Sequence, residues 1–184
     1  NMVAGNLSIE FNLRGPNLAM VTACTTGTHS IGVGARLIAA GDADAMLVGG
    51  AEMGTTPVGL GGFAAARALS TRNEEPHKAS RPWDKDRDGF VMGEGAGVLV
   101  LKRLDDAVED GNDIHAVIRG IGASSDGRGK GITAPSQRGQ MQALARAYSQ
   151  AGFSPATVEL VEAHGTSTKV GDAMELATLN KLWH

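Results

Sequence analysis

One stretch of the sequence decides the fold, residues 18–41, which read LAMVTACTTGTHSIGVGARLIAAG. The apolar run from Leu18 to Thr22 predicts an extended strand. From Thr25 to Ala40 the apolar side chains recur at helical spacing, and Gly41 is a typical stop signal. The stretch therefore predicts a strand, a tight turn and a helix, with Cys24 at the turn.

The rest of the sequence alternates in the same way. Helical patterns span residues 58–69, 104–110, 137–150 and 172–182, and strand-like runs cover residues 45–48, 89–103, 114–122 and 158–161. Strands that alternate with helices predict an α/β layered fold. No linker long enough to divide the chain is visible, so we expect a single domain over residues 1–184.

Composition excludes several classes of protein. With 42% hydrophobic and 20% charged residues, the chain is not a disordered polymer. A net charge of −3 argues against a nucleic-acid partner. Its apolar runs are far shorter than the roughly 18 residues of a membrane span. Glycine supplies 26 of 184 residues, about twice the usual share, which predicts tight turns and close backbone approaches.

The two ends of the sequence suggest an excerpt of a longer polypeptide. The chain opens on Asn1-Met2 without the charged and apolar regions of a signal peptide, so we expect a cytoplasmic protein. It stops at Trp183-His184, directly after an apolar helical pattern and without a capping glycine.

Cys24 is the only cysteine, which excludes an internal disulfide framework and a cysteine-rich zinc site. A thiolate at the start of a helix is favoured by the helix dipole and by the unpaired N–H groups of the first turn. Cys24 is therefore a candidate nucleophile. The alternative is a small, buried apolar side chain, which is common for cysteine.

His164 is the second candidate. It follows the apolar run 158–161 and precedes Gly165, a position at the carboxyl end of a strand where α/β proteins bind ligands. An imidazole there could donate a hydrogen bond to a thioester or enolate oxygen. The alternative is a histidine that bonds only to nearby backbone. His29, on the Cys24 helix, is interpreted as a packing residue or a helix-face hydrogen bond.

A faint internal repeat links the two candidates. Residues 23–28 read ACTTGT and residues 163–168 read AHGTST, and each follows an apolar run and precedes a helical pattern. The similarity suggests two related halves that each present one chemical group at a strand-to-helix turn.

Two binding motifs fail. Residues 84–89 read DKDRDG, like the first half of a calcium loop, but the twelfth loop position is Gly95 instead of glutamate. We interpret the run as a charged turn and expect no metal site. The G-x-G-x-x-G fingerprint of dinucleotide binding is also absent from the sequence.

Several motifs, in order, resemble one enzyme family. Residues 15–17, 22–27 and 49–52 look like the active-site cysteine region of β-ketoacyl-acyl-carrier-protein synthases, or ketosynthases. Residues 162–168, with Gly171, Asp172 and Glu175, look like the first histidine motif of that family. Further matches are residues 63–70, 81–84, 88–91 and 93–97. The resemblance covers essentially the whole chain.

The two parts of the chain resemble different branches. Up to about Gly111 the sequence is most similar to the elongating enzyme of bacterial type II fatty-acid synthesis, synthase II. From Ile114 onward, above all at residues 122–135, it is more similar to the ketosynthase domains of polyketide and polyunsaturated-fatty-acid megasynthases. The resemblance allows either a fatty-acid or a polyketide pathway. It also allows either a free-standing enzyme or a domain of a multidomain chain.

The resemblance implies a thiolase-like αβαβα fold, incomplete in this chain, and a homodimer. Residues 1–184 would be the central part of a ketosynthase domain. Cys24 would take the acyl chain as a thioester, and its backbone N–H would form half of an oxyanion hole. His164 would assist decarboxylation of the malonyl unit and stabilise the enolate. No cofactor would be needed apart from the phosphopantetheine on the acyl carrier protein, the expected partner; no nucleic acid or membrane is implied.

The resemblance also implies binding residues. Thr166 and Thr168 would line the pantetheine path, with Thr133 nearby. Phe63 and Phe90 would lie by the acyl pocket or the dimer interface, and Arg67 would meet the acidic carrier protein. Asp172 and Glu175 would support the histidine loop.

The family also requires a second histidine with a preceding lysine, and a glycine-rich loop with a gating phenylalanine. Both would lie past His184, so we expect this excerpt alone to be inactive. Two rival functions are a thiolase, which condenses without decarboxylation, and a non-catalytic partner subunit that sets chain length. The Arg81-Pro82-Trp83 segment favours the synthase over the thiolase, and Cys24 argues against the partner subunit.

Overall fold

The computed structural model describes residues 2–129, 131 and 133–183. Lys130 and Ile132, in the stretch 122–135 that resembles megasynthase domains, lie outside the described residues. The chain forms two compact units, one made of residues 1–53 and 94–117 and the other of residues 54–93 and 118–184. Each unit is therefore built from two separate stretches of sequence.

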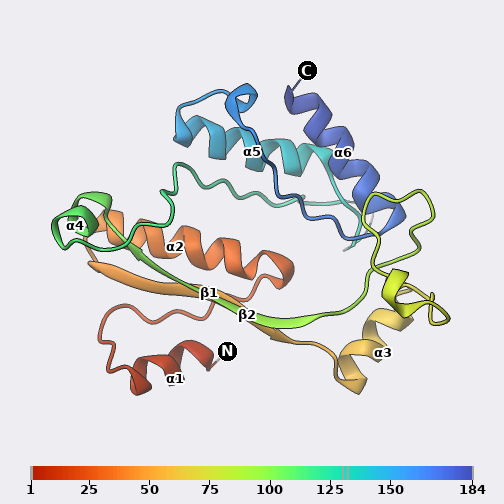
Figure 1. Cartoon of the computed structure of the whole chain (residues 1–184), viewed down its shortest axis with the longest axis horizontal. Helices are drawn as coiled ribbons and strands as arrows, with labels where there is room; N and C mark the ends of the chain where they lie inside the picture. The colour runs from red at the N-terminus through yellow and green to blue at the C-terminus, as the bar shows by residue number, and fades with distance from the viewer. Residues whose placement is uncertain (1, 130, 132, 184) are drawn as a thin grey trace. The chain divides into compact units, whose positions relative to one another are not determined.

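The first unit is organised around a two-stranded antiparallel sheet. Its elements are helix α1 (Val3–Glu10), helix α2 (Thr26–Ala40), strand β1 (Ala45–Met53), strand β2 (Glu94–Lys102) and helix α4 (Leu104–Glu109). In the strand register, Ala45 lies opposite Lys102 and Met53 opposite Glu94. Helix α2 runs along one face of the sheet (Figure 1).

A glycine lets helix α2 approach the sheet closely. A Cβ atom placed on Gly34 would lie 2.5 Å from Cγ1 of Val48, so any larger residue would push the helix away. Val48 and Ile38 are buried at this contact, and full burial of such a side chain contributes about 1.5–3 kcal/mol. Side chains alternate between faces along a strand, and Val98 and Val100, on the opposite face, are exposed.

Helix α2 ends where the sequence predicts. Gly41 adopts the left-handed conformation, with φ 83°, which glycine tolerates without steric cost. Its N–H bonds to the Ile38 carbonyl. Arg103 then bonds to Asp44 and Asp106, both at 2.6 Å, and so links the loop before β1 to helix α4. These two carboxylates raise the pKa of the Arg103 guanidinium.

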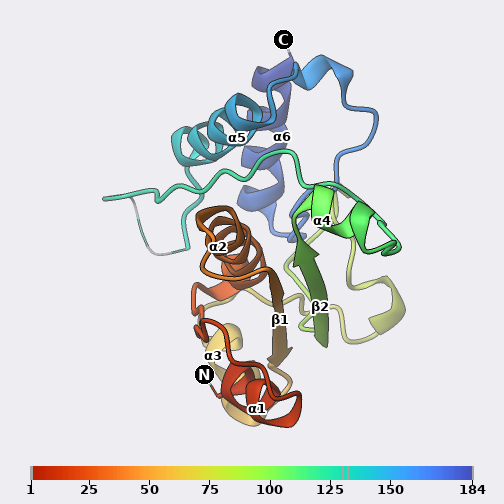
Figure 2. The ribbon, with the colours of Figure 1, turned by 90° about the vertical axis from the view of Figure 1, so that its left-hand side faces the viewer.

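The second unit contains helices α3 (Pro57–Ala65), α5 (Gln137–Ala151) and α6 (Lys169–Trp183). Helices α5 and α6 pack against each other (Figure 2). The Ser136 hydroxyl caps α5 by accepting a hydrogen bond from the Gly139 N–H at 3.2 Å, and Gly152 ends the helix with φ 75°. The helices predicted at 137–150 and 172–182 are thus confirmed within three residues at each end.

The strand predictions are confirmed only in part. The strand predicted at 45–48 is confirmed and extends to Met53, and the strand-like run 89–103 contains one strand, β2. The strands predicted at 18–22, 114–122 and 158–161 are wrong, because these described residues pair with no neighbouring strand. Helix α1 was not predicted.

Two of these segments pack on helices instead. A Cβ on Gly122 would lie 1.9 Å from the Ala143 carbonyl oxygen of α5, so residues 120–122 lie directly on the helix backbone. Val158 and Val161 line a shallow apolar groove with Leu176 of α6. The structure combines helices with a small sheet, which agrees with the expected α/β class. In the described ranges, no helix combines the length and apolar character that crossing a bilayer requires.

Candidate active site

Cys24 lies in the first unit, in a 3₁₀ turn formed by residues 23–25 immediately before helix α2. Its side chain is exposed, so the alternative of a buried, apolar cysteine is wrong. The residue before it, Ala23, has φ 51°, a left-handed conformation that costs a residue with a Cβ atom about 1–3 kcal/mol and persists only where the surroundings enforce it.

Four hydrogen bonds enforce this turn. The Thr22 N–H donates to Oγ1 of Thr26 at 3.0 Å, and the Thr26 hydroxyl donates to the Ala23 carbonyl at 2.8 Å. The Thr25 hydroxyl donates to the Thr22 carbonyl at 2.7 Å. Nδ1 of His29, one turn into α2, lies 2.8 Å from Oγ1 of Thr22. His29 therefore makes a hydrogen bond from the helix face, one of the two roles predicted for it.

The first N–H groups of α2 follow directly on the turn that carries Cys24. Thr25 occupies the capping position, but its hydroxyl bonds backward to Thr22 instead of accepting from the first N–H groups of the helix. Those N–H groups carry the positive end of the helix dipole. A cysteine beside a helix start is the arrangement expected of a candidate nucleophile.

His164 lies in the second unit, in a loop of residues 163–168 that leads into helix α6; we call it the histidine loop. His164 is exposed. The Glu175 carboxylate, from the second turn of α6, accepts hydrogen bonds from the His164 N–H at 2.7 Å and the Gly165 N–H at 3.0 Å. One side chain thus fixes the backbone on both sides of the His164 α-carbon.

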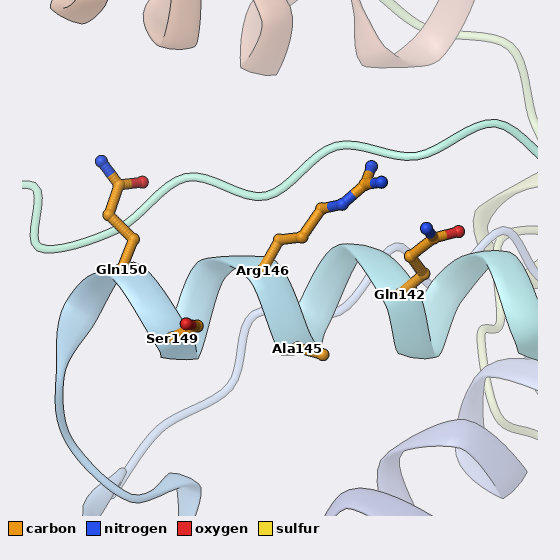
Figure 3. Close-up of a pocket in the computed structure, with 5 residues that line it drawn as sticks. All are labelled: Gln142, Ala145, Arg146, Ser149 and Gln150. Atoms are coloured by element: carbon orange, nitrogen blue, oxygen red, sulfur yellow. The ribbon is translucent and has the colours of Figure 1, made fainter.

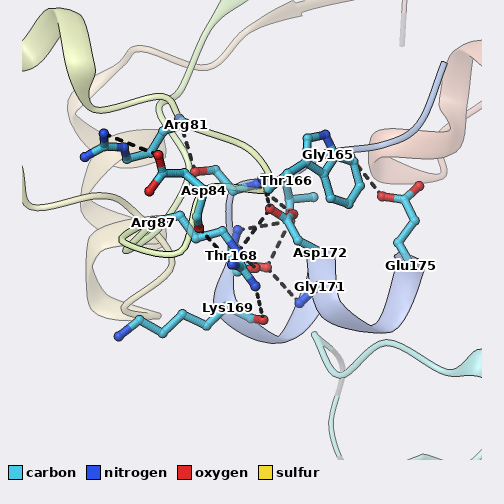
Figure 4. A network of polar contacts seen from close by, with 12 residues as sticks. Arg81, Asp84, Arg87, Gly165, Thr166, Thr168, Lys169, Gly171, Asp172 and Glu175 are labelled. Carbon is cyan, nitrogen blue, oxygen red and sulfur yellow. Dashed lines mark hydrogen bonds and ion pairs between the residues drawn. The ribbon is translucent and has the colours of Figure 1, made fainter. Parts of the chain in front are cut away.

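Asp172, in the first turn of α6, is completely buried and fixes the rest of the loop. Its Oδ1 atom accepts from the Ser167 N–H at 3.0 Å and from the Thr166 hydroxyl at 3.4 Å. Its Oδ2 atom accepts from the Trp83 N–H at 2.8 Å and lies 3.1 Å from Nε of Arg87 (Figure 4). A buried carboxylate requires such compensation, since an unpaired one would be very costly.

Trp83 and Arg87 belong to residues 81–88, which we call the arginine loop. This run contains most of the failed calcium motif, and the structure explains its charges differently. Oδ1 of Asp84 accepts the Asp86 N–H at 2.7 Å, so that side chain organises the loop itself. Among the described residues, no group of three or more histidine, cysteine or acidic side chains could hold a metal ion.

Asp88 fastens the end of the arginine loop to residues 70–71. Its carboxylate accepts from the Ser70 hydroxyl at 2.6 Å and from the Thr71 N–H at 3.0 Å. These bonds, the Ser70 hydroxyl first, favour the charged form and hold the pKa of Asp88 below its usual value.

The threonines predicted to line the pantetheine path bond to each other. Oγ1 of Thr166 lies 2.9 Å from Oγ1 of Thr168, which also accepts the Gly171 N–H at 3.1 Å and so caps α6. Both residues are half-buried. Thr133 is exposed, in a turn where the Ala134 N–H bonds to the Gly131 carbonyl.

The two predicted phenylalanines meet in the second unit. The rings of Phe63 and Phe90 are 5.1 Å apart and nearly perpendicular, at 82°, a favourable edge-to-face arrangement. Phe90 is tied to the chain after α3 by hydrogen bonds with Ala68 and Ser70. Arg67 is exposed and has φ 54°, just past the end of α3.

The structure thus groups the predicted residues into two sets. Cys24 belongs to the first unit, and the other predicted site residues belong to the second: His164, Thr133, Thr166, Thr168, Phe63, Phe90 and Arg67. Sequence patterns assign no role to Arg87, although its Nε atom donates to the Thr168 carbonyl of the histidine loop. A shallow depression on α5, lined by Gln142, Ala145, Arg146, Ser149 and Gln150, includes none of these residues (Figure 3).

Comparison with known proteins gives a consistent result. Residues 1–107 match the family described as "Beta-ketoacyl synthase, N-terminal domain", and residues 115–184 match "Beta-ketoacyl synthase, C-terminal domain". The 3-oxoacyl-[acyl-carrier-protein] synthase 2 of Vibrio cholerae is 55% identical over 98% of this chain and 44% of its own length. The mitochondrial 3-oxoacyl-[acyl-carrier-protein] synthase of Arabidopsis thaliana is 45% identical over 100% of this chain and 40% of its own length. The chain therefore spans less than half the length of these relatives.

Solved structures show the same fold. A β-ketoacyl synthase from Burkholderia phymatum superimposes with a TM-score of 0.93 and 38% identity, over 98% of this chain and 43% of that one. The ketosynthase from module 6 of the bacillaene synthase of Bacillus subtilis gives 0.91 and 37%, over 98% and 32%. The thiolase-like ketosynthase fold expected from the motifs is thus confirmed, and nearly the whole chain is similar both to a 3-oxoacyl-[acyl-carrier-protein] synthase 2 and to a polyketide ketosynthase. The chain belongs to the β-ketoacyl synthase family.

Proposed function

We propose that the whole protein is a 3-oxoacyl-acyl-carrier-protein synthase that lengthens acyl chains by decarboxylative Claisen condensation. Residues 1–184 would form the central part of its ketosynthase domain. The observation that carries the proposal is the exposed Cys24 thiol in a constrained turn at the start of α2, in a chain that belongs to the family.

In the first half-reaction, the Cys24 thiolate attacks the carbonyl carbon of an acyl thioester on the carrier protein. The phosphopantetheine thiol leaves, and the acyl chain remains on Cys24. The Cys24 N–H would form half of an oxyanion hole for the tetrahedral intermediate. Covalent catalysis of this kind divides one difficult step into two easier ones.

In the second half-reaction, malonyl-carrier loses carbon dioxide and its enolate carbon attacks the Cys24 thioester. The thiolate is released, and a 3-oxoacyl chain two carbons longer stays on the carrier. His164 would donate a hydrogen bond to the enolate oxygen from an exposed position on a loop that Glu175 fixes. Both half-reactions balance without a metal or redox cofactor, since phosphopantetheine comes with the carrier.

The remaining predicted residues would bind the substrates. Thr133, Thr166 and Thr168 would line the path of the phosphopantetheine arm, and Phe63 and Phe90 would border the acyl pocket or the dimer interface. Arg67 would meet acidic residues of the carrier protein. The protein would act as a cytoplasmic homodimer.

Acyl loading tests the proposal. The whole protein is incubated with an acyl-carrier protein, and its intact mass is measured before and after the incubation. Protease mapping then locates the added group. We expect the mass to rise by one acyl group located on Cys24, and Cys24→Ala to abolish the increase. Normal loading of Cys24→Ala would overturn the assignment. Chain lengthening by an acyl-CoA without release of carbon dioxide would indicate a thiolase instead, and an unreactive Cys24 would indicate a non-catalytic subunit.

A further inference from the structure

We infer that Arg87 is a positioning residue that holds His164 for the second half-reaction and leaves the first half-reaction unaffected. The catalytic roles of His164 and Cys24 rest on the proposed function. The placement of Arg87 does not, because it follows from the contacts between the arginine loop, residues 81–88, and the histidine loop, residues 163–168.

The Arg87 guanidinium joins the arginine loop to the histidine loop and to α6. Its Nε atom lies 3.1 Å from Oδ2 of Asp172 and donates to the Thr168 carbonyl at 3.0 Å. Its Nη2 atom donates to the Lys169 carbonyl at 2.7 Å, and Nη1 donates to the Asp84 carbonyl of its own loop at 2.9 Å. The side chain is only 14% exposed, and its bonds to the Thr168 and Asp84 carbonyls are partly shielded from water, which strengthens them.

Two residues with side chains and one glycine adopt positive φ angles where the two loops meet. Trp83 has φ 70°, Gly165 has φ 52° and Ser167 has φ 66°. Ser167 is also almost completely buried, and its hydroxyl accepts the Arg81 N–H at 3.3 Å. A Cβ atom on Gly165 would lie 3.3 Å from the Trp83 ring. Left-handed residues with side chains persist only under external constraint, and here each loop constrains the other.

His164 lies next to this junction. Gly165, the following residue, faces the Trp83 ring, and the Ser167 N–H bonds to Asp172, the partner of Arg87. If Arg87 is lost, Asp172 loses its charge partner and the arginine loop loses its bonds to Thr168 and Lys169. The histidine loop would then relax, and His164 would move away from the enolate oxygen.

Cys24 has separate support. Its turn is held by bonds among Thr22, Thr26 and His29, all within eight residues of sequence in the first unit. All the contacts of Arg87 described above are with residues of the second unit. The two half-reactions should therefore respond differently to a change at Arg87.

Lysine cannot replace this arginine. A planar guanidinium presents several N–H groups in a fixed fork, whereas an ammonium group is a compact point charge. Arg87→Lys keeps a cation beside Asp172, which preserves the fold, but it cannot serve three carbonyl oxygens and the carboxylate together. It is therefore the informative variant. Lys85→Met, at an exposed position on the same loop, is the matched control.

The test measures both half-reactions in the whole protein. For Arg87→Lys we expect release of carbon dioxide from malonyl-carrier to fall between about tenfold and a hundredfold, as for small misplacements of catalytic groups, while acyl loading of Cys24 stays within about twofold. Lys85→Met should leave both rates within about twofold. An equal fall in both half-reactions, or no fall in either, would overturn the inference.

A second measurement does not depend on activity. Hydrogen exchange of backbone amides is compared between wild type and Arg87→Lys. We expect the Ser167 amide to exchange about tenfold faster in the variant, as for the loss of one hydrogen bond to a charged group, and residues 22–28 to be unchanged. Unchanged exchange at Ser167 would contradict the inference. If wild type releases no carbon dioxide but the Ser167 amide responds, the proposed function fails and the positioning by Arg87 stands.

Discussion

The side chains of Thr22 and His29 meet across the turn that carries Cys24, with Oγ1 of Thr22 2.8 Å from Nδ1 of His29. The same Thr22 donates its N–H to Thr26 and accepts at its carbonyl from Thr25. All three polar groups of one residue are therefore used to hold the strained Ala23 conformation. Thr22 thus holds the turn that carries Cys24 at the start of α2.

Removing the Thr22 hydroxyl should slow the reaction of Cys24. In Thr22→Val the bond to His29 is lost, so the turn can relax and the thiolate leaves the best field of the helix dipole. A dipole interaction is typically about 0.3–1 kcal/mol, which corresponds to a fall of about two- to fivefold in the rate of alkylation by iodoacetamide at pH 7. The rate is followed at the Cys24 peptide by mass spectrometry.

Two variants control that measurement. Thr22→Ser keeps the hydroxyl and should retain the wild-type rate. Thr28→Val makes the same replacement at an exposed position in the first turn of α2 and should have no effect. Equal rates for Thr22→Val and Thr28→Val would show that the bond to His29 does not position the thiol.

Glu175 should contribute to stability through the histidine loop. In Glu175→Gln one carboxylate oxygen becomes an NH₂ group that faces a backbone N–H donor, so one of the bonds to His164 and Gly165 is lost. We expect the free energy of unfolding to fall by about 0.5–1.5 kcal/mol, the net contribution of a typical hydrogen bond, measured by urea denaturation. Glu162→Gln, an exposed neighbour, should change it little, and a fall of the same size there would refute the prediction.

Asp88 should make stability sensitive to acid. Its pKa is lower in the folded protein than in the unfolded chain, because the Ser70 hydroxyl and the Thr71 N–H stabilise the carboxylate. The stabilisation is present above the unfolded pKa of about 4 and is lost as the pH falls through the folded value. Between about pH 5 and pH 2, urea midpoints should therefore fall more steeply for wild type than for Asp88→Asn.

The control for Asp88 is Asp86→Asn, which removes a carboxylate from an exposed position of the same loop. Its acid dependence should follow that of wild type. If Asp88→Asn and Asp86→Asn lose stability in parallel with wild type, the bonds to residues 70–71 do not stabilise the charged form.

Gly122 should tolerate no side chain. Its position on the α5 backbone places a new Cβ atom 1.9 Å from the Ala143 carbonyl oxygen, so Gly122→Ala must displace the segment or the helix. We expect a loss of about 2–4 kcal/mol in the free energy of unfolding. Gly61→Ala, in α3 with no atom within 4 Å of the new methyl group, should instead stabilise by about 0.5–1 kcal/mol. Similar effects at both positions would contradict the close packing.

The helices other than α1 were the predictable part of the fold. The pattern of Thr25–Ala40, with Gly41 after it, and that of residues 137–150 carry both the period and the end signals of a helix, and these signals are local in sequence. The runs at 114–122 and 158–161 look like strands because they are short and apolar. A strand also needs a neighbouring strand with which its backbone can form hydrogen bonds. These two runs pack against α5 and α6 instead.

The candidate catalytic residues could be predicted from the sequence, but the residue that positions the histidine loop could not. Cys24 and His164 stand out because their neighbours are small and a helix follows each of them. Arg87 could not be found in this way, since it lies 85 residues before Asp172 in the chain and the surrounding charges resemble an ordinary solvated turn. Only the folded chain shows that its guanidinium is nearly buried.

One measurement tests the central claim most directly. The whole protein, loaded with an acyl chain on Cys24, is mixed with malonyl-carrier labelled at its free carboxyl group, and the labelled carbon dioxide and the carrier-bound product are quantified together. We predict one carbon dioxide released for each 3-oxoacyl chain formed, two carbons longer than the loaded chain, and a strongly reduced rate for His164→Ala. A 3-oxoacyl product formed without carbon dioxide, or an unchanged rate for His164→Ala, would contradict the account.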